Sequence, residues 1–293
     1  MAAGNLTRRL AFSVVAIPAA VGIAYLGGWY FAGLIALVAV LGARELYDFA
    51  AAQGIDPLRR MGMFGAAAIP LGTVVWVRAP YAYGWPQSLL YSGALWLITL
   101  VGIAAWRRGP AGRPLAAVAV TVFGALYAGG LPAFAIALRH WLGYGPGDEP
   151  WAGTALLFFP LVLTWVGDTA AYAGGTAFGG PKLAPVLSPN KTWSGAACGL
   201  AGTLLAAAGY STWVLRPVGQ GLDLLSVLVA GFFISAAGQV GDLAESVFKR
   251  EIGVKDSSAL IPGHGGVLDR FDALYFVLPV TAALYSIFFG LSA

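Results

Sequence analysis

Acidic, basic and glycine residues gather in one stretch near the end of the chain. Asp242, Glu245 and Lys249 follow one another at spacings of three and four, which places them on one face of a helix. A glycine-rich turn at 263–266 then leads into a segment that carries Asp269. Such a turn at a helix N-terminus can bind phosphate through its backbone N–H groups. Carboxylates beside phosphate are typical of a site that holds Mg²⁺. The stretch therefore predicts metal-assisted phosphoryl or nucleotidyl transfer.

Two earlier features could add to this site. Asp168 lies in a long apolar segment, where an ionised carboxylate costs about 2.5–3.5 kcal/mol inside a membrane, so we expect a functional group or half of a buried pair. The motif Ser188-Pro189-Asn190-Lys191-Thr192 is expected to open a helix. Ser or Thr before a helix, with Pro at its first position, is an ordinary capping arrangement, and we prefer this interpretation for the motif taken alone. The same arrangement also presents N–H groups to an anion, and Lys191 would add a full charge.

Other polar features are expected to be structural. Arg44, Glu45 and Asp48 end the second apolar segment, and the spacing of four between Arg44 and Asp48 favours an interfacial charge pair over a site. The one cysteine, Cys198, lies in an apolar stretch. A single cysteine excludes an intrachain disulfide and a thiolate cluster, so we expect it to be a small packing residue.

The helices that carry these residues are expected to cross a membrane. Charged residues make up 10% of the 293 residues and hydrophobic ones 59%, whereas soluble domains have about 25% charged residues. The mean hydropathy is +0.77, and there are too few charges to cover a soluble surface. The apolar runs are continuous and lack the alternation of barrel strands, which indicates helices. Many approach the roughly 20 residues that cross a hydrocarbon core.

We therefore expect an all-α fold, a polytopic transmembrane helical bundle of about nine spans with a cytoplasmic N-terminus and an external C-terminus. The expected spans are 10–26, 29–48, 62–78, 88–106, 115–138, 151–175, 192–214, 222–249 and 268–290. Residues 1–150 would form a scaffold with possible dimer or lipid contacts, and residues 151–293 would carry a site that faces the cytoplasm. The two parts are expected to form one integrated membrane domain.

The basic residues support this orientation. With a cytoplasmic N-terminus, three of the seventeen Lys and Arg residues (Arg78, Arg139 and Arg216) fall in external loops, and the other fourteen lie on the cytoplasmic side. Such an excess of Lys and Arg inside is typical of membrane proteins. Arg8 and Arg9 before an apolar run are also typical of a signal peptide, but the eight spans that follow favour an uncleaved first helix.

The stretch from Ser246 to Asp272 resembles the signature of the phosphatidate cytidylyltransferase family when it is written as S-x-x-K-R-x4-K-D-x-S-x3-P-x-H-G-G-x-x-D-R-x-D. The GD-x-x-E-S motif from Gly241 is also similar to that family, as are the segment around Asp168 and the SPNKT motif at 188–192. The resemblance is densest over residues 160–275. One departure is visible, because the family has an acidic residue shortly after the SP-x-K-T motif, where this chain reads Trp-Ser-Gly.

The resemblance implies a Mg²⁺-dependent transfer of CMP from CTP to phosphatidic acid, which gives CDP-diacylglycerol and pyrophosphate; a second metal ion is left open. The implied catalytic residues are Asp168, Asp242, Lys249 and Asp269. The implied metal ligands are Asp168, Asp242 and Asp269, with Glu245, Asp256 and Asp272 as further candidates. The implied substrate-binding residues are Ser188, Lys191, Thr192, Ser246, Arg250, Lys255, His264, Gly265, Gly266 and Arg270.

The expected partners are CTP, phosphatidic acid and membrane lipids. The family suggests a homodimer, and no nucleic acid is expected, because the net charge of +4 reflects inside loops that face anionic headgroups. The Ala- and Gly-rich composition points to the plasma (inner) membrane of a bacterium. Two alternatives remain. The first is a cytidylyltransferase or kinase that acts on another membrane lipid. The second is an ion-coupled carrier, in which carboxylates would lie near the bilayer midplane.

Overall fold

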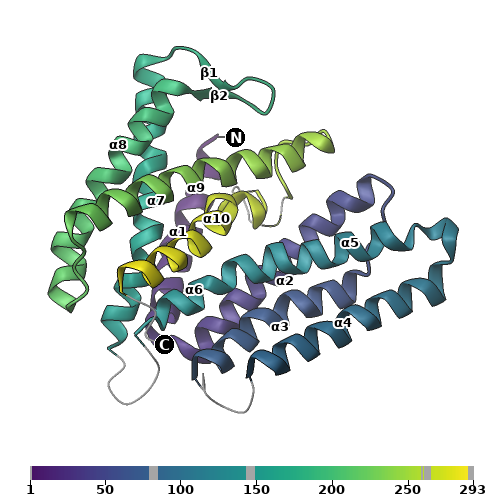
Figure 1. The fold of residues 1–293 in the computed structure, drawn as a ribbon. Helices are drawn as coiled ribbons and strands as arrows, with labels where there is room; N and C mark the ends of the chain where they lie inside the picture. Colours follow the sequence, from purple (N-terminus) through teal and green to yellow (C-terminus); the bar gives the residue numbers. More distant parts are fainter. Residues whose placement is uncertain (1, 79–84, 143–148, 259, 261–264, 290–293) are drawn as a thin grey trace. The chain divides into compact units, whose positions relative to one another are not determined.

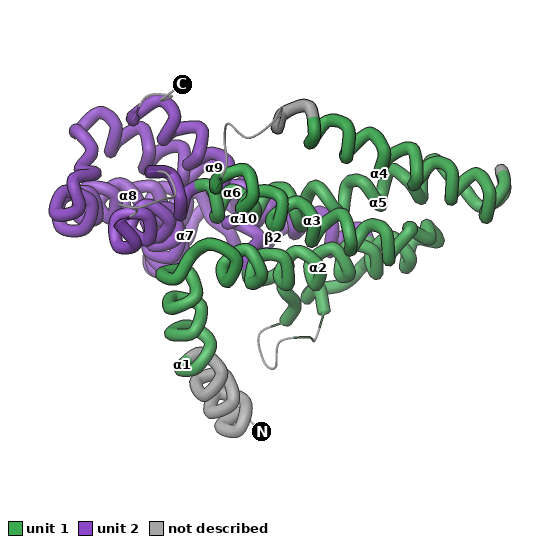
Figure 2. The backbone as a smooth tube through the Cα atoms, turned by 90° about the horizontal axis from the view of Figure 1, so that it is seen from below, with its two compact units in different colours: residues 1–137, 143–146, 252–270 green, residues 138–142, 147–251, 271–293 purple. Residues whose placement is uncertain are grey.

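The computed structural model describes residues 2–78, 85–142, 149–258, 260 and 265–289, and it describes the side chains of these residues except 2–13, 85–87 and 110. The chain divides into two compact units (Figure 2). The first comprises residues 1–137, 143–146 and 252–270, and the second comprises residues 138–142, 147–251 and 271–293. These units are a division by packing, and the functional division expected at residue 150 stays a prediction.

Eight helices of the described chain are long and apolar enough to cross a membrane. They are α2 (Gly28–Ala52), α3 (Arg59–Arg78), α4 (Trp85–Arg108), the helix from α5 (Pro114–Ala125) through η2 (Leu126–Gly130) to α6 (Leu131–Arg139), α7 (Pro150–Phe178), the helix from α8 (Trp193–Tyr210) through η3 (Ser211–Leu215) and η4 (Arg216–Val218), α9 (Leu224–Glu251) and α10 (Leu268–Phe288) (Figure 1). The short η1 (Pro110–Gly112) follows α4.

The first expected span coincides with α1 (Ala2–Leu26), whose apolar part with described side chains is Val14–Leu26. The all-α polytopic bundle is therefore confirmed, and each of the nine expected spans coincides with a helix. The orientation of the termini stays a prediction.

In the first unit, Tyr47 of α2 is the centre of a packing contact among three helices. A Cβ atom on Gly62 of α3 or on Gly124 of α5 would clash with the Tyr47 side chain. The buried Tyr47 hydroxyl donates to the carbonyl oxygen of Thr121 at 2.8 Å. Asp48, one residue further along α2, pairs with Arg59 of α3 rather than with Arg44. The expected Arg44–Asp48 pair is thus wrong, because α3 brings a cation closer to Asp48 than the same helix does.

In the second unit, α7 packs along α8 through small residues. A Cβ atom on Gly167 would clash with the Thr203 hydroxyl, and one on Gly174 would clash with the Cys198 side chain. Cys198 therefore fills space at a close helix contact, as expected. Tyr285 of α10 is buried and donates to the Leu156 carbonyl of α7 at 2.9 Å, so α10 is tied to the same helix.

A small antiparallel hairpin between α7 and α8 was not expected from the sequence. It is formed by β1 (Lys182–Ala184) and β2 (Ser188–Thr192). The expectation that Ser188 and Pro189 open a helix is therefore wrong, since both lie on β2. Each strand of this pair has an open edge, where a proline is tolerated. The cap itself is present four residues later, where the Thr192 hydroxyl accepts from the Gly195 N–H at 3.1 Å.

Candidate functional site

A pocket of about 490 Å³ with charged residues in its lining lies in the second unit among α7, the β-hairpin, α8 and α9. Its charged lining residues are Asp168, Lys191 and Asp242, and Gln239 and Thr192 add polar groups. The three charged residues come from three different elements: Asp168 from α7, Lys191 from β2 and Asp242 from α9. The pocket therefore gathers, in one place, three residues that lie far apart in the sequence.

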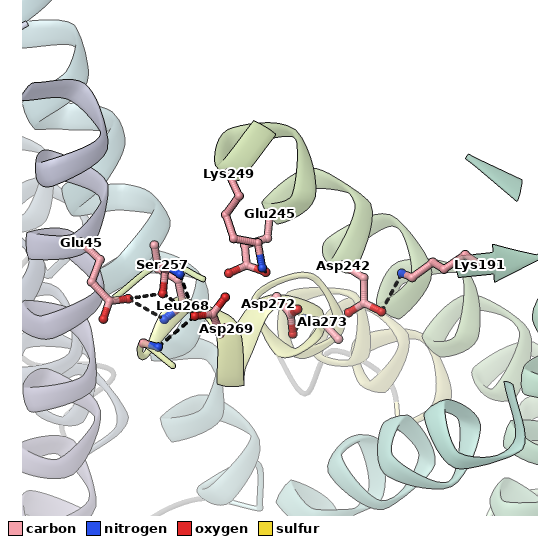
Figure 3. A network of polar contacts seen from close by, with 11 residues as sticks. Glu45, Lys191, Asp242, Glu245, Lys249, Ser257, Leu268, Asp269, Asp272 and Ala273 are labelled. Atoms are coloured by element: carbon pink, nitrogen blue, oxygen red, sulfur yellow. Dashed lines mark hydrogen bonds and ion pairs between the residues drawn. The ribbon is translucent and has the colours of Figure 1, made fainter. Parts of the chain in front are cut away.

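Lys191 and Asp242 form an ion pair across the pocket, with the Lys191 ammonium donating to Asp242 Oδ2 at 2.8 Å (Figure 3). The side chains are 29% and 25% exposed, respectively. The hairpin explains the position of Lys191, because Thr192 caps α8 directly after it and so anchors the end of β2. A partly exposed ammonium can exchange its carboxylate for a phosphate oxygen, and this would release Asp242 for a cation.

Asp168, Asp242 and Asp272 of the second unit lie close enough for their carboxylates to act on one another electrostatically. Lys191 acts on Asp168 with the opposite sign. The closeness of α9 and α10 explains part of this, since a Cβ atom on Gly241 would lie 2.6 Å from the Asp272 carbonyl oxygen. Carboxylates in mutual range repel one another, and a nearby positive charge offsets that repulsion.

No group of three or more His, Cys, Asp and Glu side chains in the described part of the chain is gathered closely enough to hold a metal ion. Mg²⁺ is usually held by one or two carboxylates together with phosphate oxygens and water. Asp168 and Asp242 line one pocket and supply hard oxygen donors of this kind. The residues present thus fit Mg²⁺ that arrives with a phosphate ligand.

Glu245 and Lys249 form a second ion pair, one turn apart on α9. The Lys249 ammonium donates to Glu245 Oε2 at 2.7 Å, and the two side chains are 14% and 2% exposed, with Glu245 the more buried. Because an ionised carboxylate is costly to bury without a partner, Lys249 has a structural role here in addition to the catalytic role that the resemblance implies.

In the first unit, one carboxylate oxygen of Asp269 holds the turn that precedes α10. Asp269 Oδ2 accepts from the Ser257 N–H, the Ser257 hydroxyl and the Gly266 N–H, each at 2.8 Å. Gly265 has a φ of +80°, which favours glycine. A Cβ atom on Gly266 would clash with the Ser257 hydroxyl. The glycine pair is therefore required by the backbone and by the close approach of Ser257.

Glu45 of α2 is a residue that sequence reasoning placed wrongly among the interfacial charges. It is buried, at 3% exposed, and its carboxylate accepts from the Ser257 hydroxyl and the Leu268 N–H (Figure 3). It also accepts from the Ser258 hydroxyl and the Val267 N–H. The signal that could have found it is the one used for Asp168, an acidic side chain inside an apolar span.

The remaining expected site residues lie as follows. Ser188 and Ser246 are half-buried, whereas Arg250, Lys255, Asp256 and Arg270 are exposed. His264 lies outside the described residues. By unit, Lys255, Asp256, Gly265, Gly266, Asp269 and Arg270 belong to the first, and Asp168, Ser188, Lys191, Thr192, Asp242, Glu245, Ser246, Lys249, Arg250 and Asp272 belong to the second. The roles assigned to these residues stay predictions.

Comparison with known proteins gives both a family and relatives. A phosphatidate cytidylyltransferase of Synechocystis sp. is 32% identical over 293 residues, with 94% of each chain covered. The protein of the same name from Brucella suis biovar 1 is 47% identical over 144 residues. That match covers 49% of each chain, so it spans about half the length of this relative. The phosphatidate cytidylyltransferase of Haemophilus influenzae is 42% identical over 137 residues, or 47% of this chain and 48% of its own. The model of the cytidylyltransferase family matches residues 7–288, and this chain therefore belongs to that family.

Proposed function

We propose that this protein transfers CMP from CTP to phosphatidic acid, forming CDP-diacylglycerol and releasing pyrophosphate. The observation that carries the proposal is the pocket in which Lys191 pairs with Asp242 beside Asp168. It offers one cation for a phosphate and two carboxylates for a metal ion that comes with it. Membership of the cytidylyltransferase family and the names of the relatives support CTP and phosphatidate as the substrates.

In the proposed reaction, a phosphate oxygen of phosphatidate forms a bond to the α-phosphorus of CTP. The bond from that phosphorus to the oxygen bridging to the β-phosphate breaks, and pyrophosphate leaves with the electron pair. Because the attacking oxygen is already anionic, no strong base is needed. The side chains contribute by orienting the two phosphates in line and by neutralising their charge.

Each pocket residue has a proposed part in this. Lys191 would leave Asp242 and bind a phosphate oxygen of CTP through a charge-assisted hydrogen bond. Asp168 and Asp242 would hold Mg²⁺, with Asp269 as the third carboxylate that the resemblance implies. Mg²⁺, when bound, would neutralise charge on the triphosphate and on the leaving pyrophosphate. The Thr192 hydroxyl caps α8 and so keeps Lys191 at the pocket.

The location of the reaction belongs to the same proposal. The eight membrane-crossing helices of the described chain make this a membrane protein. We place it in a bacterial plasma membrane with the pocket facing the cytoplasm, where CTP is found, because the Lys and Arg distribution favours that orientation. Phosphatidate would enter from the bilayer with its acyl chains between helices. A homodimer remains part of the proposal.

The experiment is pyrophosphate release by the detergent-purified chain given CTP, phosphatidate and Mg²⁺, with each omitted in turn and with ATP in place of CTP. Asp242→Asn is expected to abolish release. The matched control is Asp223→Asn, because Asp223 caps α9 in the same unit by accepting from the Ser226 N–H at 2.9 Å and asparagine caps as well as aspartate does.

Release that requires CTP, lipid and metal together, and that is lost only in Asp242→Asn, would support the proposal. Release with CTP but only with a different lipid acceptor would overturn phosphatidate as substrate. Release with ATP would indicate a lipid kinase. Flux of an ion-coupled solute in sealed vesicles, without turnover of CTP, would overturn the enzyme and favour a carrier.

A further inference from the structure

The carboxylate of Glu45 lies at the start of α10, although Glu45 itself belongs to α2, in the part of the chain expected to be scaffold. Both residues lie in the first unit. Oε1 accepts from the Val267 N–H and Oε2 from the Leu268 N–H, each at 2.9 Å. The first N–H groups of a helix have no partner within it, and a negative charge at this end is favourable. Glu45 thus caps a helix that follows it by more than 200 residues.

The same carboxylate also holds the loop before α10. Oε1 accepts from the Ser258 hydroxyl at 2.6 Å, and Oε2 accepts from the Ser257 hydroxyl at 2.9 Å. With the two backbone N–H groups, four donors converge on two oxygens. A carboxylate has about four acceptor positions and no donor, so its capacity matches the donors around it. A Cβ atom on Gly266 would lie 2.5 Å from Oε1, which shows how closely the loop is wrapped around Glu45.

One of these donors links Glu45 to Asp269. The Ser257 hydroxyl lies 2.9 Å from Glu45 Oε2 and 2.8 Å from Asp269 Oδ2, and the Ser257 N–H donates to the same oxygen of Asp269 (Figure 3). The single proton of the Ser257 hydroxyl is therefore shared between the two carboxylates, while the Ser257 N–H donates to Asp269 alone. Any shift of Ser257 away from Glu45 changes two of the three hydrogen bonds that orient Asp269.

We propose that Glu45 is a positioning residue for the reaction. Its carboxylate orders the signature loop, defined here as residues 252–258 and 265–267, and through Ser257 it sets the orientation of Asp269. This rests on the proposed function, in which Asp269 is a carboxylate of the active site. Glu45 itself touches no substrate in this proposal.

Glutamine is the informative replacement because it has the shape of glutamate but not its acceptors. The amide of glutamine has one acceptor oxygen and an NH₂ group that only donates. Whichever way the amide is turned, its NH₂ faces one serine hydroxyl, which can rotate to accept, and one backbone N–H, which can only donate and so loses its acceptor. Ser258→Ala is the milder variant, since it removes one donor to Glu45 and leaves every bond to Asp269 in place. Asp48→Asn is the matched control, because Asp48 lies one turn away on α2 and pairs with Arg59.

The first measurement is amide hydrogen exchange of the full-length protein in detergent, without substrate. In Glu45→Gln, we expect a peptide covering residues 265–270 to exchange at least about tenfold faster than in wild type, since the capped N–H groups lose their acceptor. Peptides from α7 to α9 serve as the internal reference and are expected to keep their rates. Ser258→Ala is expected to show a smaller increase, and Asp48→Asn none.

The second measurement is steady-state pyrophosphate release, in the assay described above. In Glu45→Gln we expect kcat to fall about 100-fold, the effect of misplacing a reacting group by about 1 Å. The KM for CTP is expected to stay within about threefold, because binding contacts are not removed. If Glu45 had a purely structural role, Glu45→Gln would instead give less folded protein with a normal kcat per folded molecule.

The outcomes separate this proposal from the proposed function. Faster exchange with reduced kcat supports the positioning role. Unchanged exchange in Glu45→Gln overturns it, and so does faster exchange with normal kcat, because the loop order would then be irrelevant to the reaction. A wild-type protein that releases no pyrophosphate refutes the proposed function, whereas the exchange comparison still decides whether Glu45 orders the loop.

Discussion

Replacing Lys249 with methionine removes the positive charge that lies against the buried carboxylate of Glu245. The Lys249 ammonium is 2.7 Å from Glu245 Oε2, and the side chains are 14% and 2% exposed. Breaking a buried pair by removing one partner costs about 3–5 kcal/mol, because the other charge stays buried without compensation. Since Lys249 retains some exposure, we expect the lower end, a loss of about 3 kcal/mol in the free energy of unfolding.

For a chain of this size, a loss of about 3 kcal/mol corresponds to a thermal midpoint lower by about 6 °C, at roughly 2 °C per kcal/mol. The assay is thermal unfolding of the detergent-purified variants, followed by tryptophan fluorescence. Glu245→Gln combined with Lys249→Met should recover most of the loss, since the buried charge is then gone. Lys182→Met, at an exposed position of β1, is the control and should stay within about 0.5 kcal/mol of wild type.

A wild-type midpoint in Lys249→Met would refute this reasoning, because the pair would then contribute nothing to the fold. A raised KM for CTP with an unchanged midpoint would instead assign Lys249 to substrate binding, as the family resemblance implies. A lowered midpoint that the double variant does not recover would show that Glu245 is not the group that Lys249 compensates.

Three further predictions concern the pocket and the two close approaches. Lys191→Met should change the free energy of unfolding by less than about 1 kcal/mol, since the pair with Asp242 is partly exposed. It should raise the KM for CTP at least about tenfold, the effect of losing a charge-assisted hydrogen bond. Equal losses in thermal midpoint and activity would contradict this. Gly241→Ala should destabilise the protein by about 1–3 kcal/mol, because its Cβ would lie 2.6 Å from the Asp272 carbonyl oxygen. An unchanged thermal midpoint would show that α9 and α10 can separate at no cost. Gly266→Ala should reduce pyrophosphate release at least about tenfold by displacing Ser257, and normal release would rule out the close wrapping of this loop.

Much of the fold could be predicted from local composition. Crossing a hydrocarbon core requires a certain length of apolar helix, and this requirement is met or missed within some 20 consecutive residues. The spans at 29–48 and 151–175 therefore coincide with α2 and α7, with differences of a few residues at the ends. The β-hairpin was missed because a short apolar-polar segment beside a helix is compatible with either a cap or a strand, and the cap signal of Thr192 is real.

For the candidate site too, part could be predicted from the sequence and part could not. Residue types and spacing alone singled out Asp168, Asp242 and Asp269, since charged side chains in or beside apolar helices are costly and need a reason to be there. Spacing also predicted that Glu245 and Lys249 share a face of one helix, which the pair on α9 confirms. Periodicity within a helix reports which residues share its face, and it reports nothing about the element opposite that face.

The sequence by itself therefore determined the membrane class, the positions of the helices and the stretches in which the chemistry is concentrated. Only the tertiary structure decided the partners: Lys191 pairs with Asp242 across 51 positions, and Glu45 reaches Val267 across 222. The physical reason is that apolar burial in a membrane follows from the local sequence, whereas a hydrogen bond between distant elements depends on how helices pack. The small residues at the contacts, such as Gly241 and Gly266, permit that packing, but their presence in the sequence does not indicate which neighbouring group will occupy the space.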